Sequence, residues 1–177
     1  MLGRLQHPGI AQIFDAGYDS SSLGEQPYFA MELIEGQTLT AHCAATDASI
    51  RERCELIAKI CDAIQHAHDR GVIHRDLKPA NVLVATIDGH DPLPKILDFG
   101  IARCVDAGQN FGTGAWGTLT TQSGLLLGTL AYMSPEQFLR GQADARSDVY
   151  STGVMLYELL SGTLPHELEG KSMTEVH

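Results

Sequence analysis

The sequence predicts an α+β fold, with strands in the first part of the chain and long helices after them. Two segments before residue 36 are rich in apolar and aromatic residues and are separated by turn formers, as is typical of strands. A helix cap followed by apolar residues at steps of three and four begins at Ser49. A second, strongly apolar helical segment surrounds residue 155. With 177 residues, 44% of them hydrophobic, the chain can bury a core as one domain.

The first 36 residues predict a helix end followed by two strands. Met1–Gln6 resembles the last turn of a helix, which Pro8 ends because proline disfavours helical geometry in the residue before it. Strands are expected at 10–18 and 27–34, joined by a turn region rich in serine and glycine.

The clearest helix begins after Ser49, where Glu52 completes a capping box, and it ends at Gly71. Its predicted buried face consists of residues spaced by three and four: Ile50, Cys54, Ile57, Cys61 and Ile64. This places Cys54 and Cys61 in the core as small hydrophobic side chains. His66 and His68 point to different faces of the helix, so they are not expected to form a metal site together.

Two further elements follow. Residues 82–86 and 93–97 are short apolar segments around the turn DGHDP, which predicts a β-hairpin. The segment from Ser147 to Gly162 is apolar on almost every side, which predicts a helix buried all round and ended by Gly162.

Composition excludes several classes of function. A formal net charge of −10 argues against a nucleic-acid binder or an anionic-membrane binder, since both need clustered Lys and Arg. The four cysteines show no metal-ligand spacing and no disulfide framework. Neither a membrane-spanning run nor a signal peptide is visible, so a cytoplasmic location is expected, although a longer parent chain could be anchored elsewhere.

Residues whose side chains could take part in catalysis or binding are concentrated in three motifs. The first is His74-Arg75-Asp76-Leu77-Lys78-Pro79-Ala80-Asn81, the second is Asp98-Phe99-Gly100, and the third is GTLAYMSPE at 128–136. Together they resemble the catalytic loop, the metal-binding motif and the substrate-binding end of the activation segment in eukaryotic-like (Hanks-type) serine/threonine protein kinases. The strings LKPAN, SPEQ and DGHDPLP are similar to bacterial members in particular.

The resemblance implies a two-lobed protein-kinase-like fold that is truncated at both ends. Residues 1–36 correspond to a remnant of the small lobe and the hinge, and residues 37–177 to an incomplete helical large lobe. The family's glycine loop and its ATP-gripping lysine are expected to precede residue 1. The glycines at 112–117 match a phosphate-binding pattern by letter, but they follow Asp98 and are interpreted as part of the activation segment.

The resemblance assigns the reaction to four residues. Asp76 is expected to orient the substrate hydroxyl and accept its proton, while Lys78 places positive charge beside the transferring phosphoryl group. Asn81 and Asp98 supply oxygen ligands suited to Mg²⁺. ATP and protein substrates are the implied partners.

Other residues are assigned by their alignment with the same motifs. ATP is expected to contact the following residues: Met31, Glu32, Ile34 and Leu83. By residue type alone, 31–34 is merely an apolar core strand, and this alternative stays open. Structural support is expected from the following residues: His74, Phe99, Gly100 and Asp148. Asp148 is expected to brace the backbone of the catalytic loop.

The activation segment has its own expected residues: Arg75, Thr121, Ser123, Thr129 and Glu136. A phosphate on Thr121 or Ser123 would pair with Arg75, and a flexible segment rich in Thr and Ser explains the composition equally well. Thr129 is expected to contact Asp76 and Lys78.

Two other functions stay open from the sequence. One is a non-catalytic, pseudokinase-like interaction module or inactive fragment, because the ATP-gripping lysine is absent. The other is a small-molecule phosphotransferase, which shares an Asp and Asn loop but is not expected to combine Asp98-Phe99-Gly100 with Ser134-Pro135-Glu136.

Overall fold

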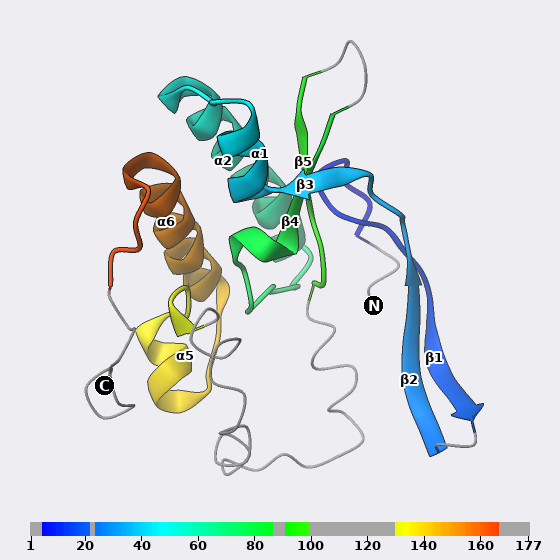
Figure 1. The fold of residues 1–177 in the computed structure, drawn as a ribbon. Coiled ribbons are helices and arrows are strands. Elements are labelled where there is room, and N and C mark those ends of the chain that lie inside the picture. Colours follow the sequence, from blue (N-terminus) through cyan, green and yellow to red (C-terminus); the bar gives the residue numbers. More distant parts are fainter. Residues whose placement is uncertain (1–4, 22–23, 87–90, 100–129, 167–177) are drawn as a thin grey trace.

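The computed structural model describes residues 5–21, 24–86, 91–99 and 130–166. The chain begins with an antiparallel hairpin of β1 (Ile13–Ser21) and β2 (Gly24–Met31), which extends away from the helices (Figure 1). Both strands run further toward the turn than the predicted 10–18 and 27–34, and β2 ends at Met31, so 32–35 is irregular. Residues 5–7 are not helical, and the rest of the predicted helix end, 1–4, lies outside the described residues.

A second sheet has the strand order β3-β4-β5. β3 (Gly36–Thr38), β4 (Val82–Ala85) and β5 (Leu93–Ile96) are antiparallel neighbours, so the predicted hairpin around DGHDP is confirmed. The chain just before β1 runs parallel to β5 through a bridge between Ile10 and Ile96, in which the Ala11 amide donates to the Ile96 carbonyl at 2.9 Å. This bond connects the N-terminal segment to the sheet that lies between the first and second motifs.

The helices are α1 (Leu39–Ala45), α2 (Ile50–His68), α5 (Pro135–Arg140) and α6 (Ala145–Ser161), and the short 3-10 turn η2 covers Pro79–Asn81. None of the described helices is both long and apolar enough to cross a membrane. α2 and α6 pack against each other, and α2 also lies on β5 (Figure 1). The first motif lies between α2 and β4, and the second begins after β5.

The capping box at the start of α2 is confirmed, and the predicted buried face is confirmed at Ile57 and Ile64 but wrong at its other three residues. Ser49 and Glu52 exchange hydrogen bonds as expected. Ile50 is 70% exposed, and Cys54 and Cys61 are also exposed. The buried stripe shares Ile57 and Ile64 with the predicted face and is completed by other residues: Leu56, Ile60, Ala63 and Ala67. That stripe contains the larger apolar groups, and its alanines permit close packing against the rest of the fold.

α6 begins at Ala145, because Asp144 caps it, two residues before the expected start. Gly162 ends it in the left-handed conformation at φ +77°, as predicted. The prediction of a helix buried all round is wrong, since Val149 is 65% exposed and Tyr157 is 49% exposed. Only one side of α6 packs against α2, so the apolar residues on the other side remain on the surface of the described chain.

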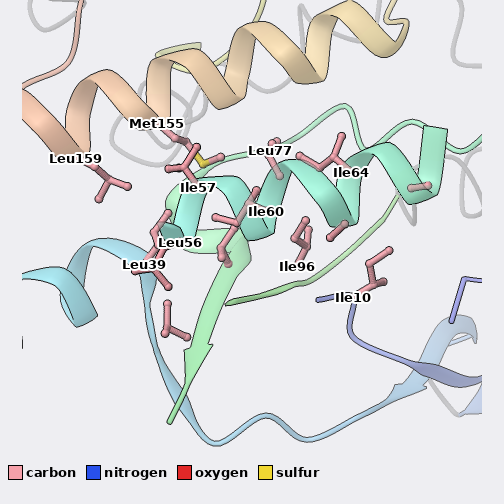
Figure 2. Packing of buried hydrophobic residues seen from close by; sticks show 14 of the residues in the cluster. Ile10, Leu39, Leu56, Ile57, Ile60, Ile64, Leu77, Ile96, Met155 and Leu159 are labelled. Atoms are coloured by element: carbon pink, nitrogen blue, oxygen red, sulfur yellow. The ribbon is translucent and has the colours of Figure 1, made fainter. Parts of the chain in front are cut away.

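The core lies between α2, α6 and the second sheet (Figure 2). Ile60 of α2, Ile96 of β5 and Met155 of α6 are completely buried and come from the three layers that meet there. Leu77, from the middle of the first motif, is 1% exposed and joins the same cluster. Burying a Leu side chain contributes about 1.5–3 kcal/mol, so Leu77 anchors the polar loop to the core.

Candidate active site

The segment 72–81 connects α2 to β4 and alternates buried anchors with exposed polar groups. His74, Leu77 and Pro79 are buried, whereas Asp76 is exposed and Asn81 is partly exposed. This alternation explains how one short stretch can contain both apolar and charged residues. The apolar side chains fix the path of the loop, and the charged ones are presented at its surface.

Asp148 holds this loop from α6. Its side chain is fully buried, and its two carboxylate oxygens accept the backbone N–H groups of His74 at 2.9 Å and Arg75 at 2.8 Å. His68, on the last turn of α2, lies 2.7 Å from the same carboxylate. Arg75 has φ +72°, a conformation that a non-glycine residue adopts at a cost of about 1–3 kcal/mol. The bonds to Asp148 stabilise this strained backbone.

His74 connects the catalytic loop to the segment after β5. Its Nε2 donates to the Leu97 carbonyl at 2.8 Å, and its Nδ1 accepts the Asp76 N–H at 3.3 Å. The Phe99 ring meets the imidazole edge to face at 4.8 Å. Burial lowers the pKa of His74, in agreement with a neutral ring that donates at one nitrogen and accepts at the other.

Asp76, Lys78 and Asn81 form one polar cluster. The Lys78 Nζ lies 2.9 Å from the Asp76 Oδ2. The Asn81 amide nitrogen donates to the Asp76 carbonyl at 2.7 Å and to its Oδ2 at 3.2 Å. The side chain of Asp76 is 49% exposed, so it can meet an incoming group from solvent.

Asn81 and Asp98 come from facing ends of the β4–β5 hairpin. The Leu97 N–H donates to the Asn81 carbonyl at 2.8 Å, which places Asp98 one residue beyond that link. Asp98 is exposed and has φ +58°. No group of three His, Cys, Asp or Glu side chains within the described residues could hold a metal ion. Mg²⁺ commonly needs only one or two protein ligands beside substrate phosphates, and Asn81 with Asp98 fits that requirement.

The residues expected to contact ATP lie where β2 ends and on β4. Met31, Glu32, Ile34 and Leu83 are all partly exposed. The Glu32 N–H donates to the Gln12 carbonyl at 2.8 Å. Of the two backbone groups of Glu32, only the carbonyl is therefore left to bind adenine.

An ion pair brings the same segment to the second sheet. Glu32 binds Lys95 of β5 at 2.5 Å, and this hydrogen bond lowers the pKa of Glu32. Lys95 is directly opposite Leu83, and facing residues of antiparallel strands project on the same side. Leu83 and Glu32 therefore lie toward the same face of the sheet.

The remaining predicted residues divide into two sets. Gly100, Thr121, Ser123 and Thr129 lie outside the described residues, as do the glycines at 112–117. Glu136 is partly exposed on α5 and accepts the Ser147 hydroxyl at 2.7 Å, and this bond lowers the pKa of Glu136.

Three contacting residues were missed by the sequence reasoning. His68 was considered only as a metal ligand, yet it binds Asp148. Lys95 fits an ordinary strand pattern, and Gln137 comes directly after the third motif. Nothing in the sequence around either residue predicts its contact. Gln137 donates to the Arg75 carbonyl at 2.7 Å. All three make contacts between segments distant in sequence, which local patterns do not reveal.

Comparisons with known proteins agree with the motifs. The whole chain, residues 1–177, matches the family described as "Protein kinase domain". It is 39% identical over 163 residues to the serine/threonine-protein kinase PknB of Mycobacterium leprae, covering 91% of this chain and 24% of the relative. It is 38% identical over 164 residues to the serine/threonine-protein kinase Pkn1 of Myxococcus xanthus, covering 93% of this chain and 22% of the relative.

A third relative is the probable serine/threonine-protein kinase PknB of Corynebacterium glutamicum, which is 39% identical over 170 residues, 94% of this chain and 24% of the relative. The chain thus spans about a quarter of the length of these curated relatives. The predicted resemblance to bacterial serine/threonine kinases and the predicted α+β protein-kinase fold are confirmed. The chain belongs to the protein kinase domain family.

Proposed function

We propose that this chain transfers the γ-phosphoryl group of ATP to Ser or Thr hydroxyls of proteins. The observation that carries the proposal is the cluster of Asp76, Lys78 and Asn81, held on a loop whose backbone is fixed by a buried carboxylate. Phosphoryl transfer depends chiefly on positioning and charge stabilisation, so a rigid loop with exposed polar groups is the arrangement it needs.

Asp76 is the group that we propose to receive the substrate hydroxyl. Its half-exposed carboxylate orients the hydroxyl and accepts its proton while the new oxygen–phosphorus bond forms. The bond between the γ-phosphorus and the bridging oxygen breaks, and ADP leaves. Lys78, already 2.9 Å from Asp76, places a positive charge beside the phosphoryl oxygens.

Asn81 and Asp98 are the proposed Mg²⁺ ligands. The amide nitrogen of Asn81 is held by Asp76, so its oxygen is the end left for a cation. Bound Mg²⁺ neutralises charge on the phosphates during transfer. Asp98 supplies a carboxylate from the other strand end.

We further propose that adenine lies against Met31, the carbonyl of Glu32, Ile34 and Leu83. The shared face of Leu83 and the Glu32–Lys95 pair supports this placement. In this scheme residues 1–36 act as small lobe and hinge, and residues 37–177 act as large lobe.

The activation segment is proposed to follow the family pattern. Phosphate on Thr121 or Ser123 would pair with Arg75, Thr129 would contact Asp76 and Lys78, and Glu136 would hold the end of the segment. His74, Phe99, Gly100 and Asp148 are the proposed structural supports. Intact Asp76, Asn81 and Asp98 favour catalysis over a non-catalytic interaction module.

Calorimetric titration of the protein with Mg·ATP, beside the variant Asp98→Asn, tests the proposal. We expect saturable binding in the wild type, markedly weaker metal-dependent binding in the variant, and transfer of labelled phosphate to Ser/Thr peptides by the wild type alone. A folded wild type that binds Mg·ATP but transfers no phosphate would support the non-catalytic alternative. A folded wild type that does not bind Mg·ATP would rule out an ATP-dependent kinase.

A further inference from the structure

Gln137 connects the helix that follows the activation segment to the catalytic loop. This side chain of α5 is 8% exposed, and its Nε2 donates to the Arg75 carbonyl at 2.7 Å, across 62 residues of sequence. A buried amide that makes a long-range bond to backbone is well placed to fix that backbone, because leaving either group unpaired costs about 1–3 kcal/mol.

The bond acts on the peptide unit that leads into Asp76. A peptide unit is planar, so the Arg75 carbonyl and the Asp76 N–H move together. Gln137 holds the carbonyl of this unit, and His74 Nδ1 accepts its N–H at 3.3 Å. The preceding unit is held separately by Asp148, which accepts the Arg75 N–H at 2.8 Å. Gln137 is thus one of two side chains that set the plane from which the Asp76 carboxylate projects.

Ser134 determines which end of the Gln137 amide faces the loop. Its backbone N–H and its hydroxyl both donate to the Gln137 Oε1, at 3.5 Å and 3.0 Å, and Ser134 itself is completely buried. The Ser134 N–H can only donate and the Arg75 carbonyl can only accept, so the amide oxygen faces Ser134 and the amide nitrogen faces Arg75. Ser134 of the third motif therefore has a hydrogen-bonding partner in this chain.

We propose that Gln137, oriented by Ser134, is a positioning residue for Asp76, and that it transmits the placement of α5 to the catalytic loop. This inference rests on the proposed function. Arg75 has a left-handed backbone at φ +72°, so losing the bond to its carbonyl frees a strained unit to rotate. Rotation of that unit moves the carboxylate of Asp76 relative to its substrate while leaving the ATP-contacting segments unchanged.

Three variants of the protein test the proposal. Gln137→Met keeps the length and removes all three hydrogen bonds of the amide, and Gln137→Glu keeps the acceptor for Ser134 but removes the donor. Ser134→Ala removes the hydroxyl and keeps the backbone N–H that donates to Oε1. Leu139→Ala, on the same helix at a side chain that is 53% exposed, is the matched control. Each protein is assayed for kcat, for KM of Mg·ATP and for amide hydrogen exchange of residues 74–77.

We expect both Gln137 variants to lower kcat by about tenfold or more, because small displacements of a reacting group have effects of this size. KM for Mg·ATP stays within about twofold in all variants, since none of them changes a residue expected to contact ATP. The Asp76 amide exchanges faster in both Gln137 variants, Ser134→Ala shows a smaller change of the same kind, and Leu139→Ala resembles the wild type. A merely structural role would lower the amount of folded protein without this split between kcat and KM.

The outcomes separate the two proposals. Unchanged kcat in folded Gln137 variants of an active protein overturns the positioning role and leaves the proposed function intact. A wild type that transfers no phosphate overturns the proposed function and the positioning role with it, whereas hydrogen exchange still reports whether Gln137 holds the loop. If Gln137→Met does not fold, Gln137→Glu decides, and a kcat equal to the wild-type value in that variant overturns the proposal.

Discussion

The catalytic loop and the segment after β2 are attached to the fold in opposite ways. The loop is fixed by Asp148, a fully buried carboxylate that accepts two backbone N–H groups and contacts His68. The segment after β2 is attached by Glu32 to Lys95, through side chains that remain 30% and 17% exposed. One attachment is inside the core, and the other meets water.

The difference teaches where rigidity comes from in this chain. If the loop moved away from Asp148, a buried carboxylate would be left without hydrogen-bond partners, which is costly. The catalytic loop therefore has few alternative positions. A partly exposed ion pair is worth about 0–1 kcal/mol and is weakened by salt, so the other segment can shift at small cost. We expect the loop to keep its geometry and the segment after β2 to adjust to its ligand.

Asp148→Ala should have the largest effect on stability. The substitution leaves the N–H groups of His74 and Arg75 without an acceptor inside the fold, and we expect the free energy of unfolding to fall by about 3–5 kcal/mol. Urea unfolding of the wild type and the variant measures this difference in free energy. Asp62→Ala removes a carboxylate that is 82% exposed, so it is the control, with an expected change within about 0.5 kcal/mol. Similar losses in both variants would contradict the buried attachment.

His74 should make the stability of the loop region depend on pH. Burial lowers the pKa of His74 from an ordinary value of 6.5, so below that pH the unfolded chain binds more protons than the folded chain. The contribution of His74 to the free energy of unfolding is therefore complete above about pH 6.5 and is lost as the pH falls below it. The loss is up to about 1.4 kcal/mol for each unit by which the pKa is lowered.

The variant His74→Gln isolates this contribution. Glutamine keeps one donor and one acceptor without titrating, so the decrease between pH 7 and pH 5 should be smaller than in the wild type. Urea unfolding at several pH values gives the two slopes. Equal slopes in the two proteins would mean that other groups account for the pH dependence.

Lys95→Met should have the smallest effect on stability and a separable effect on nucleotide binding. Loss of the bond to Glu32 should lower the free energy of unfolding by about 0–1 kcal/mol, less at high salt. Under the proposed function, KM for Mg·ATP should rise several-fold while kcat stays near the wild-type value. Arg51→Met removes an ion pair on α2 whose arginine side chain is 87% exposed, and it should change neither quantity. An unchanged KM in Lys95→Met would show that the Glu32–Lys95 pair does not place the nucleotide.

Local patterns predicted those features that depend on neighbouring residues. The capping box of Ser49 with Glu52, the hairpin of β4 and β5, and the end of α6 at Gly162 are all confirmed. Each depends on residues close in sequence, whose backbone preferences are largely independent of the rest of the fold. The three motifs likewise identified the family, because each consists of consecutive residues that can be recognised without the structure.

Features that depend on distant contacts were not predictable in this way. Both Cys54 and Ile60 belong to apolar stripes of α2, and only packing against α6 and β5 decided that Ile60 is buried and Cys54 exposed. The tertiary structure likewise joined Gln137 to Arg75 and Lys95 to Glu32. The sequence by itself determined the local elements and the family motifs, since short-range sterics and the order of neighbouring residues suffice for these. The tertiary structure decided which faces are buried and which polar groups meet, because burial and long-range hydrogen bonds depend on the whole fold at once.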